Sequence, residues 1–249
     1  METNPTLEFS PEKMDFRAYS ISWNLTKRCN LNCDHCYLDA DFRGGLKTDE
    51  LNTEECFRVI DQIAEVNPNA FLILTGGEPL LRPDIYEIIR YAADKKFMVV
   101  LGTNGTMINR VNAEKIKAAG AHGVGISIDS MNPDKHNKFR GVDKAWELSM
   151  DAFDILNEVG VDFLVQMSVS DMNYKEIPEV VEFTEKIGAI AFNLYFLVCT
   201  GRGQGNTDIS NVAYEEALKM LYEQQMKYKG RLMINSKCAP QYKRVVYEN

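Results

Sequence analysis

Three of the six cysteines of this 249-residue chain, Cys29, Cys33 and Cys36, lie within eight residues. Their spacing is C-x3-C-x2-C in a polar segment. A disulfide framework would spread its cysteines more evenly and would need an oxidising compartment, so the tight group favours a metal site. Three thiolates on one short loop can bind three corners of a cubane iron–sulfur cluster. The fourth iron would then be open to a small chelate, such as the amino and carboxylate groups of a methionine.

A structural zinc site is the alternative for these cysteines. Such a site normally has four protein ligands with paired spacing. His35 is the candidate for the fourth ligand, but it lies between two of the cysteines, which is poor geometry. Lys27 and Arg28 flank the group, and they either tune a cluster electrostatically or form an ordinary solvated pair. The sequence therefore favours iron–sulfur over zinc.

The pattern of apolar residues along the chain predicts the strands and helices that position these cysteines. Near-continuous apolar runs, typical of strands covered on both faces, alternate with segments of helical period. Asn52 and Glu55 predict a capping box, and Gly120, Gly160 and Gly188 predict helix ends. We expect strands over 19–25, 70–75, 97–102, 123–128, 161–169 and 191–198, and helices over 53–64, from 83 to 92, and over 111–119, 145–159, 177–187 and 212–228.

Strict alternation of strand and helix predicts a parallel sheet with right-handed crossovers. Six units are too few for a closed eight-fold barrel, so the expected fold is α/β, an open, curved partial (β/α)6 barrel. A short strand over 231–235 follows the last helix. Functional groups of such folds gather at the carboxyl ends of the strands. The three cysteines directly follow the first strand, and so lie at that end.

Composition narrows the possible partners. The chain has 28 Lys plus Arg and 36 Asp plus Glu, a net charge of −8, which argues against a general nucleic-acid or anionic-membrane binder. No apolar run approaches the ~18 residues that cross a bilayer, and the polar residues 1–12 do not resemble a secretory signal. We therefore expect a cytoplasmic protein with no membrane or nucleic-acid partner.

The cysteine segment resembles the signature of the radical S-adenosylmethionine (SAM) superfamily, a CxxxCxxC loop after the first strand of a partial barrel. The resemblance extends over about residues 18–200. It implies a [4Fe–4S] cluster on Cys29, Cys33 and Cys36, with SAM on the open iron. It further implies reductive cleavage of SAM to methionine and a 5′-deoxyadenosyl radical, which takes a hydrogen from the substrate. An external one-electron donor of ferredoxin or flavodoxin type is implied as well.

Other segments resemble the SAM-binding motifs of this family in chain order. Gly76, Gly77, Glu78 and Pro79 look like its GGEP motif, whose strand-end backbone accepts hydrogen bonds from the methionyl ammonium. Glycines permit that close approach of backbone and ligand. The remaining cofactor contacts that the resemblance implies are Thr103 and Asn104 at the ribose, Ser127, Arg140 at the SAM carboxylate, Tyr37 along the adenine together with His35, and Leu197.

Some neighbouring residues keep two interpretations. Asp129 is either a substrate contact or a structural cap, and Arg202 either clamps a substrate carboxylate or is a solvated loop residue. Cys199 either ligates something at the barrel mouth or is a buried thiol, the more common case. Cys56, His122 and His136 are expected to be structural.

Residues 196–203 and 238–242 resemble the SPASM-type subgroup that modifies tetrapyrroles in alternative haem and haem d1 biosynthesis. We expect an N-terminal extension over 1–17, the radical SAM partial barrel over 18–229, and over 230–249 the start of a C-terminal extension or a truncated auxiliary-cluster module. The subgroup implies a second iron–sulfur cluster if the chain continues beyond Asn249.

Three functions compete on this basis. The first is modification of tetrapyrrole side chains by the radical chemistry. The second is maturation of a peptide or a cofactor by the same chemistry, so the substrate is either a small molecule or a peptide. The third is a non-catalytic iron–sulfur or zinc protein that has kept the fold.

Overall fold

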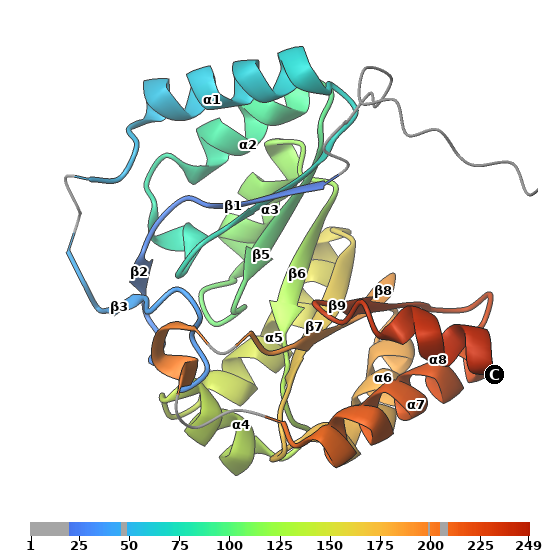
Figure 1. Ribbon diagram of the computed structural model, residues 1–249. Helices are drawn as coiled ribbons and strands as arrows, with labels where there is room; N and C mark the ends of the chain where they lie inside the picture. Colours follow the sequence, from blue (N-terminus) through green and yellow to red (C-terminus); the bar gives the residue numbers. More distant parts are fainter. Residues whose placement is uncertain (1–19, 46–48, 199, 205–208) are drawn as a thin grey trace, which may run out of the picture.

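The computed structural model describes residues 20–45, 49–198, 200–204 and 209–249. Its centre is an all-parallel sheet in the order β1-β4-β5-β6-β7-β8-β9, drawn in Figure 1 as an open, curved fan from blue β1 to red β9. The predicted fold class, an open α/β partial barrel, is confirmed. The strands are β1 Ser20–Asn24, β4 Phe71–Thr75, β5 Met98–Thr103, β6 Gly123–Ser127, β7 Phe163–Val169, β8 Ala191–Phe196 and β9 Met233–Lys237.

The sheet has one strand more than the six predicted βα units supply. β9 pairs in parallel with β8, with Tyr195 opposite Lys237. The short strand predicted after the last helix is therefore part of the main sheet. Its pattern is weak because only Ile234 of this edge strand is buried in the core, while the other four residues are polar or exposed.

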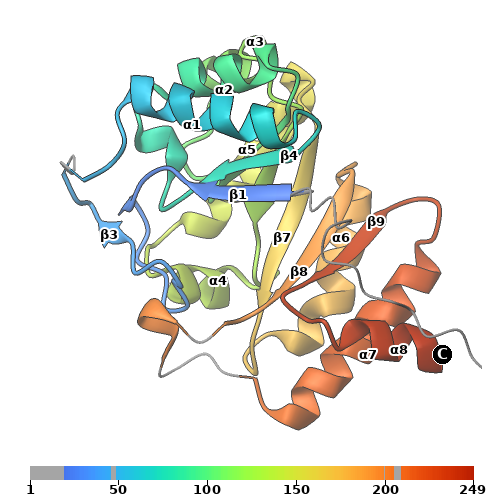
Figure 2. The ribbon, with the colours of Figure 1, turned by 45° about the horizontal axis from the view of Figure 1, so that its top comes forward.

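Helices cover the outer face of the curved sheet (Figures 1 and 2). The predicted capping box is present, because the Asn52 side chain accepts the N–H of Glu55 at 3.0 Å and the Glu55 carboxylate accepts the N–H of Asn52 at 2.9 Å. The helices are α1 Thr53–Val66, α2 Ile85–Asp94, α3 Arg110–Ala118, α4 Pro133–Arg140, α5 Ala145–Val159, α6 Ile177–Lys186, α7 Asn211–Lys227 and α8 Tyr242–Glu248, with 3-10 turns η2 Pro79–Leu81, η3 Tyr174–Glu176 and η4 Gly201–Gln204.

Two helices were not predicted. α4 is short and strongly polar, so its hydrophobic period is faint; it begins after the Asn132 cap and ends at Gly141, where φ is 68°. α8 is shorter still. The long loop after β1 also contains a two-stranded parallel sheet, β2 Arg28–Cys29 and β3 Asp41–Phe42. No hydrophobic pattern in the sequence predicts these two short strands.

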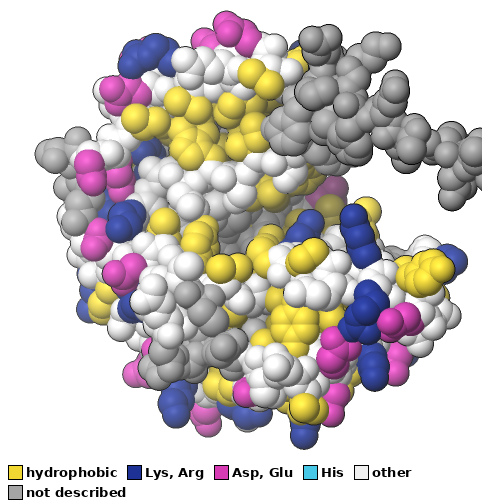
Figure 3. All heavy atoms as spheres, in the orientation of Figure 1, with side chains coloured by type: hydrophobic (Ala, Val, Ile, Leu, Met, Phe, Trp, Pro, Cys, Tyr) yellow, Lys and Arg dark blue, Asp and Glu magenta, His cyan; other side chains and the backbone are white. Residues whose placement is uncertain are grey.

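Alternation along the strands divides the sheet into two faces. One face packs against the helices through fully buried side chains such as Leu72, Leu101 and Phe192. The concave face has a separate apolar cluster of Val100, Leu164 and Ala191 with Phe71 packed on it, and it carries polar side chains nearer the carboxyl ends of the strands. The molecule is hollowed between its upper and lower parts in the space-filling view (Figure 3).

Parts of the prediction lie outside the described residues, namely the N-terminal extension over 1–17 and Cys199. Within the described ranges, no helix combines the length and apolar character that a membrane span requires. Cys56 is fully buried on the inner face of α1, as predicted.

Candidate metal and cofactor site

A cavity of about 570 Å³ opens at the carboxyl ends of the strands and contains the three cysteines. Its walls come from the loop after β1 and from the ends of β4, β5, β6, β7 and β8. Two of the predicted site residues, Glu78 and Pro79, are buried and do not line the cavity. The predicted residues that do line it are Cys29, Cys33, Cys36, Tyr37, Gly76, Gly77, Thr103, Asn104, Ser127, Arg140 and Leu197.

The cysteine loop is held by close backbone contacts with distant segments. A Cβ added at Gly77 would lie 2.2 Å from the carbonyl oxygen of Arg28, and one at Gly141 would lie 2.2 Å from that of Asn32. The N–H of Gly77 donates to the carbonyl of Thr26 at 2.7 Å. These glycines are therefore required by the approach of two chain segments, whatever they also do for a ligand.

Glu78 connects the ends of two strands rather than facing the cavity. Its carboxylate accepts the hydroxyl of Thr103 at 2.8 Å, and the backbone N–H groups of Asn104 at 3.0 Å and Leu80 at 3.1 Å. Burial raises the pKa of Glu78 to about 6, although these donors pull it down. Asn104 in turn donates to the Asn30 side chain at 2.8 Å. The motif after β4 thus fixes the end of β5, and through it the cysteine loop.

Arg140 lies between the cysteines and a buried carboxylate. Its Nη2 is 2.6 Å from Oδ2 of Asp129, which is fully buried, and its Nη1 is 3.8 Å from Sγ of Cys33. Nε of Arg140 is buried and has no hydrogen-bond partner in the described part of the chain. Asp129 also accepts the N–H of Ser168 at 2.9 Å and does not line the cavity, which fits the structural alternative for this residue.

Two histidines are buried beside Arg140. His35 stacks on Phe139 with ring centroids 4.0 Å apart, and burial lowers its pKa well below the usual value. His136 accepts the N–H of Asp129 at Nδ1, and burial, with a smaller effect from Arg140, lowers its pKa to about 3. His122 accepts the N–H of Val99 at 3.2 Å. The buried, backbone-bonded His136 fits the structural role expected for it, and the exposed His122 also bonds to backbone and does not line the cavity.

Arg202, at η4, is not a solvated loop residue. Its Nε donates to the carbonyl of Cys33 at 3.1 Å and its Nη1 to that of Ala40 at 2.7 Å. The side chain therefore lies against the cysteine loop, with Asp39 as its ion-pair partner at 3.0 Å. The sequence could not predict this, because η4 and the cysteine loop are 169 residues apart.

The thiols suit an iron–sulfur cluster as a donor set. Burial raises the pKa of Cys29 to about 12 and also raises that of Cys33, so a bound metal must supply the positive charge that deprotonates them. Among the residues that the structure describes, no group of three His, Cys, Asp or Glu side chains is placed to hold one metal ion. A cubane cluster does not need its three thiolates gathered around a single ion, because each thiolate binds a different iron.

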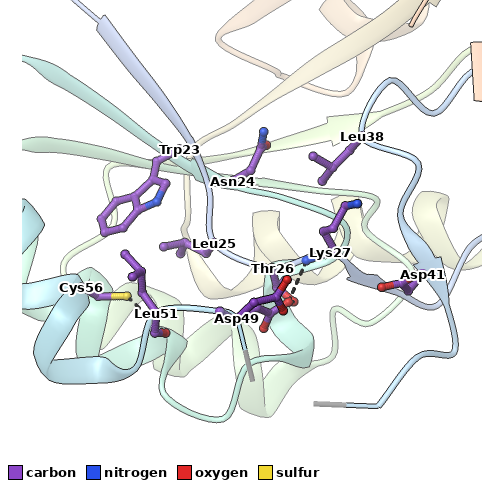
Figure 4. Close-up of a pocket in the computed structure, with 11 residues that line it drawn as sticks. Trp23, Asn24, Leu25, Thr26, Lys27, Leu38, Asp41, Asp49, Leu51 and Cys56 are labelled. Atoms are coloured by element: carbon purple, nitrogen blue, oxygen red, sulfur yellow. Dashed lines mark hydrogen bonds between the residues drawn. The ribbon is translucent and has the colours of Figure 1, made fainter. Parts of the chain in front are cut away.

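A second pocket, of about 380 Å³, lies on the other side of the loop and shares no lining residue with the first. Figure 4 shows Trp23 and Cys56 at one end of it and Lys27 and Asp41 at the other. Glu50 accepts the Thr26 hydroxyl at 2.6 Å and the N–H of Lys27 at 2.8 Å. These bonds tie the base of the cysteine loop to the segment that leads into α1.

Several cavity residues were missed by the sequence analysis. They are polar side chains at alternate positions of otherwise apolar strands, which is the signal that could have found them. Cys238, which follows β9, lines the same cavity and is exposed. The missed residues include Ser22, Thr75, Gln166, Ser168 and Tyr195.

Comparison with known proteins gives a family match and curated relatives. Residues 23–184 match the family model of the radical SAM superfamily. The chain is 38% identical to the AdoMet-dependent heme synthase of Methanosarcina barkeri, over 91% of this chain and 63% of that protein. It is 34% identical to the pre-heme d1 synthase of Dinoroseobacter shibae, over 75% of this chain and 45% of that protein. The chain thus spans less than two thirds of these relatives.

Among solved structures, the fold resembles that of Streptococcus suis SuiB bound to its precursor peptide SuiA. The TM-score is 0.77, at 14% sequence identity, over 93% of this chain and 51% of that one. At this identity the likeness concerns the fold alone.

Proposed function

This chain belongs to the radical SAM superfamily, and we propose that its cavity holds a [4Fe–4S] cluster on Cys29, Cys33 and Cys36 with SAM bound beside it. When bound, the two cofactors would supply reductive cleavage of SAM to methionine and a 5′-deoxyadenosyl radical that takes a hydrogen atom from the substrate. The observation that carries the proposal is the gathering of all three thiols with the predicted SAM contacts in one cavity.

Charged side chains and backbone groups of this chain would orient SAM in the cavity. We assign the SAM carboxylate to Arg140, whose buried Nε lacks a partner in the described part of the chain and whose guanidinium faces the cavity. Gly76 and Gly77 would present backbone to the methionyl ammonium, while Glu78 and Pro79 support that segment from behind. Thr103, Asn104 and Ser127 would contact the ribose side, and Tyr37 and Leu197 the adenine.

The substrate that we propose is a tetrapyrrole, modified at a side chain in haem or haem d1 biosynthesis. Support comes from the curated relatives, two of which are named for heme synthesis and share more than a third of aligned residues with this chain. The electron would come from an external donor of ferredoxin or flavodoxin type. A peptide substrate is the second candidate, and product analysis with each substrate class separates the two.

The sequence placed the domain boundary at residue 229, but β9 beyond it belongs to the sheet. We therefore propose that a C-terminal extension starts after β9, near Cys238, and that residues 1–17 form an N-terminal extension. A second iron–sulfur cluster belongs to this proposal only for a longer chain, since the relatives exceed this chain in length.

The test is anaerobic reconstitution followed by measurement of iron, sulfide and 5′-deoxyadenosine. The reduced protein is expected to cleave SAM, and Cys33→Ala is expected to lose both the cluster and the cleavage. Cys56→Ala is the matched control, because this thiol is buried in the core at α1 and should leave the iron content unchanged. Deoxyadenosine formation by Cys33→Ala would contradict the ligand assignment, and a zinc-loaded protein that ignores SAM would favour the non-catalytic alternative.

A further inference from the structure

A short turn after β8 contacts the cysteine loop from a distant part of the chain. In Figures 1 and 2 this turn, η4, is the orange segment beside the blue loop. Gly201 has φ +59°, and a Cβ there would stand 2.5 Å from the carbonyl oxygen of Cys36. The N–H of Arg202 donates to that same carbonyl at 3.1 Å. At its closest point to the loop, η4 therefore has room for glycine only.

The Arg202 side chain reaches a second cysteine. Its guanidinium donates to the carbonyl oxygens of Cys33 and Ala40, at 3.1 Å and 2.7 Å. Its Nη2 is buried and has no hydrogen-bond partner in the described ranges, although Arg202 lines the cysteine cavity. Arg202 thus binds the backbone carbonyls of Cys33 and Cys36, two of the three proposed cluster ligands. Its Nη2 is a further donor at the same cavity.

The positive charge of Arg202 is neutralised less well by its carboxylate partner than that of Arg140, which also lines the cavity. Arg140 faces Asp129, whose side chain is 0% exposed, at 2.6 Å. The partner of Arg202 is Asp39, at 3.0 Å, whose side chain is 64% exposed. Water screens an exposed carboxylate much more than a buried one. More of the positive field of Arg202 therefore remains on the side of the cysteines.

We propose that Arg202 is a positioning residue that holds the cysteine loop and, through its positive charge, raises the reduction potential of the iron–sulfur cluster. The inference rests on the proposed function, in which the three cysteines hold that cluster. Reduction adds one negative charge to the cluster, and a nearby guanidinium stabilises the more negative form. Net charge and hydrogen bonding around the cluster are known determinants of its potential.

The test is a redox titration of the reconstituted full chain, followed by electron paramagnetic resonance. Arg202→Gln is expected to move the midpoint potential to a more negative value, whereas Arg202→Lys, which keeps the charge, stays close to the wild type. Arg231→Gln is the matched control, because Arg231 is also an ion-paired arginine, 2.9 Å from Glu185, and does not line the cavity. Its midpoint potential is expected to equal that of the wild type.

Asp39→Asn gives the discriminating comparison. Asp39 has φ 49°, a conformation that asparagine adopts readily, so the backbone should tolerate the change. Loss of this carboxylate leaves Arg202 without its counter-ion, and the potential is expected to move to a less negative value. An electrostatic effect of this ion pair requires shifts of opposite sign, because the two variants remove charges of opposite sign.

The outcomes separate this inference from the proposed function. A wild-type potential in Arg202→Gln, or shifts of the same sign in Arg202→Gln and Asp39→Asn, overturns the role of Arg202. A wild-type protein that assembles no cluster overturns the proposed function instead. Where Arg202→Gln does not retain a cluster, Asp39→Asn decides: a less negative potential supports the inference, and an unchanged one overturns it.

Discussion

His136 is a neutral imidazole buried beneath the cavity wall, with a pKa of about 3 against an ordinary value of 6.5. Between these two values the unfolded chain binds a proton that the folded chain does not, so the free energy of unfolding falls as pH falls. From pH 7 to pH 5 this group alone should lower that free energy by about 2 kcal/mol.

We expect His136→Asn to remove this pH dependence, since the asparagine oxygen can accept the N–H of Asp129 without titrating. The measurement is urea unfolding of cluster-free wild type and variant at pH 5 and pH 7. Subtracting the pH dependence of the variant from that of the wild type removes the contribution of Glu78, which both proteins share. The raised pKa of Glu78 makes the free energy of unfolding rise as pH falls, opposite to His136. An equal pH dependence in both proteins would refute the assignment.

Thr103 supplies the hydroxyl that both oxygens of the Glu78 carboxylate accept, at 2.8 and 2.9 Å. Thr103→Val keeps the shape and removes this donor. The loss should cost roughly 1–3 kcal/mol of unfolding free energy at pH 7, where the buried carboxylate is charged. At pH 5, below the folded pKa of about 6, the cost should be smaller. A variant whose destabilisation does not depend on pH would contradict this account of Glu78.

At the scale of single residues, the sequence predicted which side chains gather but not what holds them. The cysteine spacing and the strand-end motifs are local patterns, so they could be found by inspection. The bonds of Arg202 to the cysteine loop and of Glu78 to Thr103 join segments far apart in the chain, and no local pattern encodes them.

Among the elements, the turn that ends α4 shows how the cysteine loop is fixed in place. Gly141 has φ +68° and would bring a Cβ to 2.2 Å from the backbone of Asn32. Gly188 has φ +78°, and a Cβ there would meet no atom of the described residues within 4 Å. Gly188→Ala should therefore cost only about 1–2 kcal/mol for its backbone conformation. Gly141→Ala should cost more and should also lower the iron bound on reconstitution, because the loop must move.

Urea unfolding and iron analysis of these two variants check the prediction. The pair is matched, since both glycines follow a helix in the left-handed conformation. Equal stability and equal iron content in the two variants would show that the contact with Asn32 does not matter.

Helices and strands with strong hydrophobic period were predicted close to their observed bounds, as for α1 and α5. α4 was not predicted because its residues are mostly polar and only His136, Phe139 and Arg140 of them are buried. Yet α4 carries Arg140, and its end contacts the cysteine loop, so a helix with a faint hydrophobic period contributes directly to the candidate site.

For the whole molecule, binding of SAM to the folded state alone should stabilise the protein. At a SAM concentration of 100 times the dissociation constant the gain is about 2.7 kcal/mol, and for a chain of this size that raises the melting temperature by roughly 5–10 °C. Thermal unfolding of the reconstituted protein with and without SAM measures this shift. Cluster-free protein is the control and should show a smaller shift, and equal shifts would argue that SAM does not contact the iron.

The open barrel itself could be predicted because alternating strands and helices permit few arrangements. A strand after the last helix was predicted as well, but its place in the main sheet was not, since β9 has the weak pattern of an edge. Its pairing with β8 carries Cys238 to the cavity, where no spacing rule would have placed it.

The attachment of η4 to the cysteine loop has a consequence for how the protein matures in the cell. Cys33 and the arginine that binds its carbonyl are separated by 169 residues of translation. A ribosome therefore releases the cysteines long before it releases their last anchor. The loop can therefore take its final position only after η4 has been made and has folded against it.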